Sequence, residues 1–257
     1  MVRRDRTDMG GQNAAFQTTQ WTQIVQARTD SNTRRREILG RVLGRYWKPV
    51  YCYLCRRGHD PEEAKDLTQG FFHEIVLGRG LVQRADRAKG RFRTFLLTAL
   101  CRYVTSCRRA KGARKRMPEG GFLRLDGWES FGLPEPVQAA TPEQAFDHAW
   151  ASALLDRVLA DVERECVAAG KAAHWAVFSA RVLGPILRDA EPPSLSVLCA
   201  EYRISSESQA SNMIITAKRR FRACLERHIL EIVGSEAEVD AEIRDLIEML
   251  SFGGARK

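Results

Sequence analysis

Four short segments of the sequence have the residue pattern of a helix N-terminus. This repeated pattern constrains the possible folds more than any other feature of the sequence. Each opens with Asp, Ser or Thr as an N-cap and has Glu or Gln three residues later, able to reach back to the cap. They are residues 60–63, 141–144, 206–209 and 235–238. Pro61 and Pro142 stand at the first helical position, where the missing N–H of proline does no harm. These signals predict helices at four places along the chain.

Apolar residues recur at helical spacing behind these starts. One stripe is sustained over four turns, at Phe92, Phe95, Leu96, Ala99, Leu100, Tyr103 and Cys107. Shorter stripes begin at Ala64, Leu154, Ala210 and Val239, and strand-like alternation is nearly absent. We interpret the stripes as faces that pack into a core, because a helix must bury its apolar side. The sequence therefore predicts an all-α fold.

The segment 117–142 interrupts the helical pattern. It contains four prolines and four glycines and is more acidic than basic. Such a composition resists regular helix and is typical of a linker between domains. It predicts a first domain at 16–116 after a disordered tail at 1–15. A second domain at 143–230 and a C-terminal helical extension at 231–257 would follow.

Positive charge is concentrated rather than spread evenly. The chain carries a formal charge of +9, and residues 84–116 hold twelve Lys or Arg against one acid. Dense cations of this kind neutralise phosphates, and neighbouring aromatic rings stack on unpaired bases. The candidate contacts are Arg91, Arg93, Arg102, Arg108, Arg109 and Lys111. The alternative is a solvated basic face above an aromatic core, because the aromatic residues share the apolar stripe.

A second basic element follows the pattern of a helix-turn-helix. A short helix at 194–202 and a tight turn at 203–205 precede a capped helix at 206–225. Small polar residues begin that helix and basic residues follow, as in a helix that reads base edges and holds phosphates. The candidate contacts are Ser206, Ser208, Gln209, Asn212, Lys218, Arg219 and Arg220. The alternative is a pair of packed helices in a bundle.

Other classes of protein find little support in the sequence. Cys52 and Cys55 form a lone CxxC motif without a second pair of ligands, so we expect no metal site and interpret both as helix-face fillers. No nucleophile–base spacing or Gly-rich phosphate loop is present, which predicts a non-enzymatic protein without a cofactor. The polar N-terminus and the lack of a long apolar run predict a cytoplasmic, nucleoid-associated protein with no membrane contact.

Taken together, these motifs resemble the extracytoplasmic-function (ECF) family of RNA polymerase sigma factors. The segment 66–69, with sequence DLTQ and followed by two phenylalanines, is similar to the helix of that family that binds the polymerase clamp. Residues 90–97 resemble the start of its promoter-melting helix, and 204–221 resemble the helix that reads the upstream promoter element. The opening stretch 16–21 and the extra C-terminal helix are closest to a subgroup of ECF-like factors common in planctomycetes.

The resemblance implies particular partners and residue roles. Asp66, Gln69 and Phe72 would bind the beta-prime clamp of core RNA polymerase. The basic helix would hold the melted non-template strand, and the second domain would dock on double-stranded promoter DNA. An anti-sigma factor is a further possible partner, for which the sequence gives no sign. Gly70 stands where the family usually has Glu, and Arg102 where many members have Asn. The serine-rich start of the recognition helix also departs from typical members.

Two rival hypotheses remain open beside a sigma factor. A helix-turn-helix regulator that binds DNA without polymerase would explain the second domain but leave the first without a purpose. A degenerate sigma homologue that now binds another partner would explain the departures at Gly70 and Arg102. An RNA-acting enzyme would need a catalytic cluster that the sequence does not contain.

Overall fold

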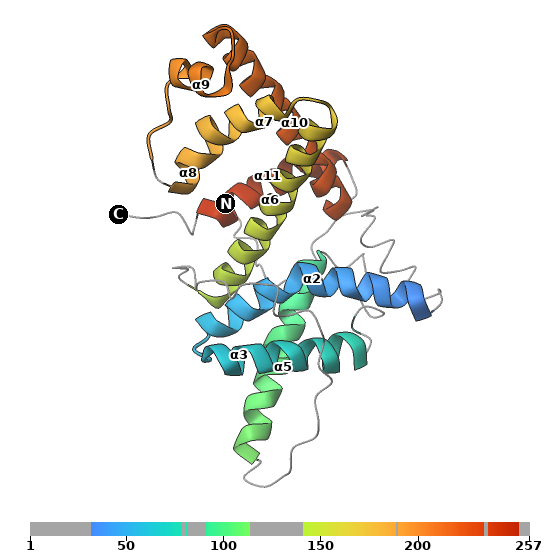
Figure 1. The fold of residues 1–257 in the computed structure, drawn as a ribbon. Coiled ribbons are helices and arrows are strands. Elements are labelled where there is room, and N and C mark those ends of the chain that lie inside the picture. Colours follow the sequence, from blue (N-terminus) through green and yellow to red (C-terminus); the bar gives the residue numbers. More distant parts are fainter. Residues whose placement is uncertain are drawn as a thin grey trace. The chain divides into compact units, whose positions relative to one another are not determined.

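The computed structural model of the chain describes residues 32–78, 81, 91–113, 141–188, 190–233 and 236–251. Within those ranges the regular structure is entirely helical, which confirms the all-α fold class (Figure 1). Most of the expected linker, the expected N-terminal tail and the stretch 16–21 lie outside the described residues.

The chain divides into two compact units. Unit 1 consists of Met1–Ser152 and Leu230–Lys257, and unit 2 of Ala153–Ile229. The chain enters unit 2 within helix α6 (Pro142–Ala168) and leaves it within helix α10 (Glu207–Val233). The C-terminal segment, expected as an extension that follows the second domain, is therefore grouped with the first unit.

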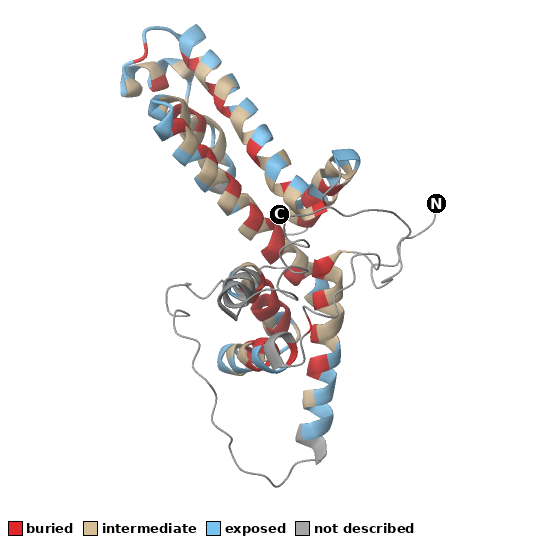
Figure 2. Ribbon diagram, turned by 90° about the vertical axis from the view of Figure 1, so that its right-hand side faces the viewer, coloured by how far each residue is buried: buried red, intermediate tan, exposed pale blue. Residues whose placement is uncertain are grey.

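Unit 1 is built around helices that cross one another. They are α2 (Asn32–Arg56), α3 (Pro61–Gly70) with its π-helical continuation η1 (Phe71–Gly78), α5 (Phe92–Ala113) and α11 (Glu236–Ser251). Large side chains fill the core: Tyr53, Leu54, Phe71, Phe72, Leu96, Leu100 and Phe146 are all fully buried. Figure 2 shows buried residues along one side of α5, as its apolar stripe predicted.

Helix starts in unit 1 use the caps that the sequence indicated. The Asp60 carboxylate accepts a hydrogen bond of 2.9 Å from the backbone N–H of Glu63. Thr141 and Gln144 cap each other, with bonds of 3.1 and 3.2 Å in opposite directions. Each bond satisfies a backbone group that the first helical turn leaves without a partner. The fourth expected cap, Ser235, lies outside the described residues, and α11 begins directly after it.

Unit 2 contains the helix-turn-helix. Helix α7 (Ala172–Phe178) continues through η4 (Ser179–Leu183) into α8 (Gly184–Arg188), and α9 (Leu195–Tyr202) then leads to α10. A small apolar core joins α7, α9 and α10 through Val177, Phe178, Leu198, Ile204, Ala210, Ile214 and Ala217. Partly buried Trp175 and Phe221 pack against it. The apolar stripe predicted to begin at Ala210 thus packs into this core.

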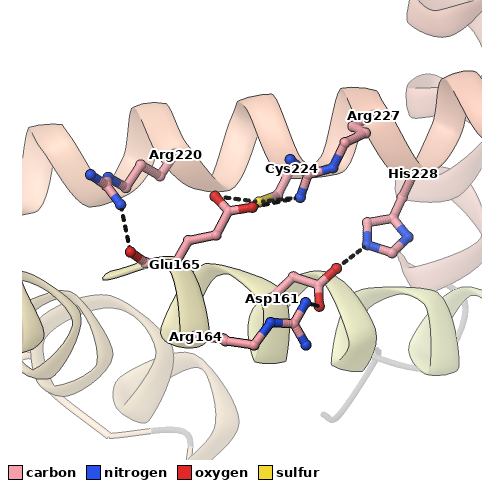
Figure 3. A network of polar contacts seen from close by, with 7 residues as sticks. All are labelled: Asp161, Arg164, Glu165, Arg220, Cys224, Arg227 and His228. Atoms are coloured by element: carbon pink, nitrogen blue, oxygen red, sulfur yellow. Dashed lines mark hydrogen bonds and ion pairs between the residues drawn. The ribbon is translucent and has the colours of Figure 1, made fainter. Parts of the chain in front are cut away.

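A network of polar contacts fastens α6 to α10 within unit 2 (Figure 3). The Asp161 carboxylate contacts His228 at 2.7 Å and Arg164 at 2.5 Å. Partial burial disfavours the ionised form of Asp161. The hydrogen bond from His228 and the charge of Arg164 outweigh that effect, so the pKa of Asp161 is lowered.

One helical turn further along α6, Glu165 makes a second set of contacts with α10. Its carboxylate accepts a 2.7 Å hydrogen bond from Arg227, which lowers the pKa of Glu165. The Cys224 thiol donates to the other carboxylate oxygen at 3.5 Å. The two carboxylates therefore hold α10 along two turns of α6.

Candidate nucleic-acid interface

The C-terminal half of α5 presents a basic surface. Arg102, Arg108 and Arg109 are exposed there, together with the small polar residues Thr105 and Ser106. Figure 1 shows this part of α5, in green, extending beyond the other helices of unit 1. Three cations on an exposed helix are suited to phosphate contacts. The backbone of Lys111 continues the same helix, while the cluster at 114–116 lies outside the described residues.

The aromatic residues of α5 belong mainly to the core. Phe92 and Tyr103 are buried, and Phe92 meets Tyr46 edge to face at a ring-centroid distance of 5.4 Å. Phe95 is half-buried and is the one ring among these three with much exposed surface. This agrees with the expectation that most of the aromatic stripe packs inward, and it leaves Phe95 as the candidate for stacking on a base.

Arg93 lies in a different environment from the other candidate arginines. Its side chain is only 7% exposed, its guanidinium donates to the Glu242 carboxylate of α11, and the ring of Trp150 lies 4.6 Å away. Burial disfavours the charged form of Arg93, but the negative charge of Glu242 more than compensates and raises the pKa of Arg93. In this arrangement Arg93 is an interior residue. The predicted contact of Arg93 with DNA would require its ion pair with Glu242 to open.

Arg91 is bound to the same helix. It lies 2.9 Å from Glu242 and donates a 2.6 Å hydrogen bond to Asp245. Its side chain remains 30% exposed, so one side of its guanidinium still faces water. Both arginines at the start of α5 therefore have carboxylate partners on α11.

The clamp-binding motif is only partly at the surface. Asp66 is exposed and Gln69 is half-exposed on α3, so both can meet a partner. Phe72 is fully buried and touches Phe71 at a ring-centroid distance of 5.4 Å. We therefore correct Phe72 from a polymerase contact to a core residue, because a buried ring cannot reach a partner while the unit stays folded.

Close packing explains why glycine stands at position 70, which the sequence alone did not reveal. The hydroxyl group of Tyr103 lies against its Cα, and a methyl group at this position would overlap that hydroxyl. Burial and a hydrogen bond to Cys107 raise the pKa of Tyr103, so the hydroxyl stays protonated. The close approach of α5 to α3 therefore favours glycine at this position.

The turn of the helix-turn-helix is defined by local bonds. Arg203 adopts a left-handed conformation with φ of 53°, and Ile204 donates back to the Cys199 carbonyl at 2.9 Å. The Ser206 hydroxyl accepts from the backbone of Gln209, whose side-chain oxygen accepts from Ser205. Ser206 and Gln209, predicted to contact DNA, thus act first as caps that fix the start of α10.

The outward face of α10 carries the remaining candidates. Ser208, Asn212, Lys218 and Arg219 are exposed, and Ile215 between them is 46% exposed. Arg220 instead donates a 3.0 Å hydrogen bond to the backbone carbonyl of Glu165 near the end of α6. A cation there also suits the negative end of that helix. The open face is therefore polar near the N-terminus and basic further along.

Trp150, Glu242 and Asp245 complete a polar cluster that sequence reasoning missed. The spacing of Glu242 and Asp245, three residues apart on a helix, was visible in the sequence. Their partners lie about 150 positions earlier, and no local pattern reports such a pairing.

Comparison with protein-family models, with curated proteins and with solved structures gives no match to this chain. Across the described ranges, no helix combines the length and the apolar character that a membrane crossing requires. Function must therefore be argued from the arrangement of charges and helices alone.

Proposed function

We propose that this chain is a sigma factor of the ECF type, which binds core RNA polymerase and directs it to promoter DNA. The observation that carries the proposal is the presence of an exposed cationic helix face on each of the two units. On unit 1 it is the C-terminal half of α5, with Arg102, Arg108 and Arg109. On unit 2 it is the outward face of α10, where Lys218 and Arg219 follow polar Ser208 and Asn212.

The two faces suit different nucleic-acid structures. A helix behind a tight turn, with exposed polar residues near its start, has the form that enters a major groove. Asn212 can pair with an adenine edge while Lys218 and Arg219 hold phosphates. Half-buried Phe95 lies on the same helix as the cations of α5, and an aromatic ring beside cations favours an unpaired strand.

Run-off transcription with bacterial core polymerase on genomic fragments tests the proposal. The double variant Asp66→Ala, Gln69→Ala should lose the polymerase and give no transcript, while its helical content is unchanged. Glu163→Ala, an exposed acid on α6, is the matched control and should transcribe normally. Wild-type chain that neither binds polymerase nor starts transcription on any fragment would refute the proposal.

A helix-turn-helix regulator that acts without polymerase is the second candidate. The burial of Phe72 and Gly70 favours it, because the clamp motif then offers a partner only Asp66 and Gln69. Sequence-specific DNA binding by the chain alone, combined with no co-purification of polymerase, would select this candidate over a sigma factor.

A further inference from the structure

We propose that Arg91 and Arg93 form a phosphate-binding site for a DNA strand, and that the carboxylates of α11 occupy this site until the strand displaces them. The inference rests on the proposed function. It adds that helix α11 of the same chain competes with DNA for Arg91 and Arg93. Arginine binds carboxylate and phosphate by the same fork of N–H donors. Glu242 and Asp245 therefore stand in the places that phosphate oxygens of a bound strand would take.

The ion pair between Arg93 and Glu242 differs from an ordinary surface ion pair. Glu242 is completely buried and Arg93 nearly so, with the face of the buried Trp150 ring against the guanidinium. The ring favours a cation beside it, so Arg93 keeps its charge in this interior position. Most surface ion pairs, by contrast, contribute little to stability.

Glu242 binds both arginines of the site. Its Oε2 atom lies 2.9 Å from the Arg91 guanidinium, and Arg93 donates a hydrogen bond to Oε1. A buried carboxylate is costly to hold away from water, and these two contacts offset that cost. When a phosphate of the DNA strand replaces the carboxylates of α11, the arginines still have an anionic partner. Displacement by a polyanion therefore costs less than simple opening of the ion pairs.

Helix α11 is attached through both apolar residues and ion pairs. Leu246 and Met249 are buried, Val239, Ile243 and Leu250 are partly buried, and Ile247 is 59% exposed. Glu242 and Asp245 supply the polar part of this attachment, and a strand that takes over Arg91 and Arg93 removes that part.

The first test measures the affinity of the full chain for a short, fluorescently labelled single-stranded DNA as salt is varied. Glu242→Gln should bind more tightly than wild type, within the roughly 5- to 150-fold range of measured couplings between sites. Asp245→Asn should show a smaller change in the same direction.

Asp240→Asn is the matched control, because it removes the same charge from an exposed position of the same helix. Equal affinities and slopes for Glu242→Gln and Asp240→Asn would overturn the proposal. If both variants also support run-off transcription at the wild-type level, the sigma-factor function stands and only the competition by α11 fails.

Hydrogen exchange of the unmodified chain provides a second test that does not depend on the folding of a variant. Addition of the single-stranded DNA should speed amide exchange in peptides from 236–251 while exchange in α5 slows. Unchanged or slower exchange in α11 on DNA binding would overturn the proposal, because a competing helix must be released.

Discussion

The Tyr103 hydroxyl lies so close to the Cα of Gly70 that hydrogen is the only side chain that fits between them. Gly70 ends α3 and Tyr103 lies in the middle of α5, so this contact sets how closely the candidate clamp-binding and DNA-binding helices approach. Tyr103 also packs on Phe71 at a ring-centroid distance of 5.7 Å. A glycine within a helix is usually a cost, and here the close packing offsets that cost.

Gly70→Ala should destabilise the protein by about 1 kcal/mol in urea unfolding. Overpacking a core typically costs about 1–3 kcal/mol, and alanine recovers part of this through its better helix propensity. In a Tyr103→Phe background the overlapping hydroxyl is absent, so the same substitution should be neutral or stabilising. An equal loss of stability in both backgrounds would show that the two residues are not coupled.

Removing the carboxylate from the buried ion pair should be costly. Glu242→Ala leaves Arg93 buried without its partner, and the expected loss is about 3–5 kcal/mol of unfolding free energy. Replacing both residues together, as in Arg93→Met with Glu242→Leu, should be close to neutral, because neither buried charge remains. The check is a double-mutant cycle by urea denaturation, and additive losses would argue against a direct pair.

Neighbouring arginines on α10 should respond differently to alanine. Arg219 is exposed, so Arg219→Ala should leave stability unchanged and weaken duplex binding, with a salt slope lower by about 0.9. Arg220→Ala removes the hydrogen bond to the Glu165 carbonyl and should cost about 1 kcal/mol of stability. Fluorescence anisotropy and thermal unfolding separate the two effects. The reverse assignment would place Arg220 on the DNA.

Acid should weaken unit 2 through the network between α6 and α10. Asp161 and Glu165 have lowered pKa values in the folded chain, so the unfolded chain binds more protons. Their stabilisation is complete above the ordinary pKa values of 3.8 and 4.5, and it is lost as the pH falls through the lowered folded values.

Thermal unfolding of Asp161→Asn across this pH range checks the assignment. The variant should show a flatter dependence of stability on pH than the wild type. Glu163→Gln, exposed on the same helix, should keep the wild-type dependence. If Asp161→Asn and wild type give parallel curves, the contact with His228 does not stabilise the fold.

Local chemistry in the sequence determined several of the helices and their starts. The caps at Asp60, Thr141 and Ser206 were predicted correctly because each bond joins groups three residues apart. The apolar stripes identified the buried side of α5 because helical periodicity repeats every few residues. For the same reason the short helix α9, its tight turn and the start of α10 were placed from the sequence.

The tertiary structure alone decided which candidate residues remain on the surface. Phe72, Arg93 and Arg220 have the residue types of binding groups, yet each is committed to an interior or interhelical contact. Arg93 meets Glu242 across 149 positions of sequence, and Gly70 meets Tyr103 from another helix. Such contacts depend on the path of the whole chain, since any cation can pair with any carboxylate that the fold brings near. Local sequence patterns therefore do not predict these contacts between distant segments.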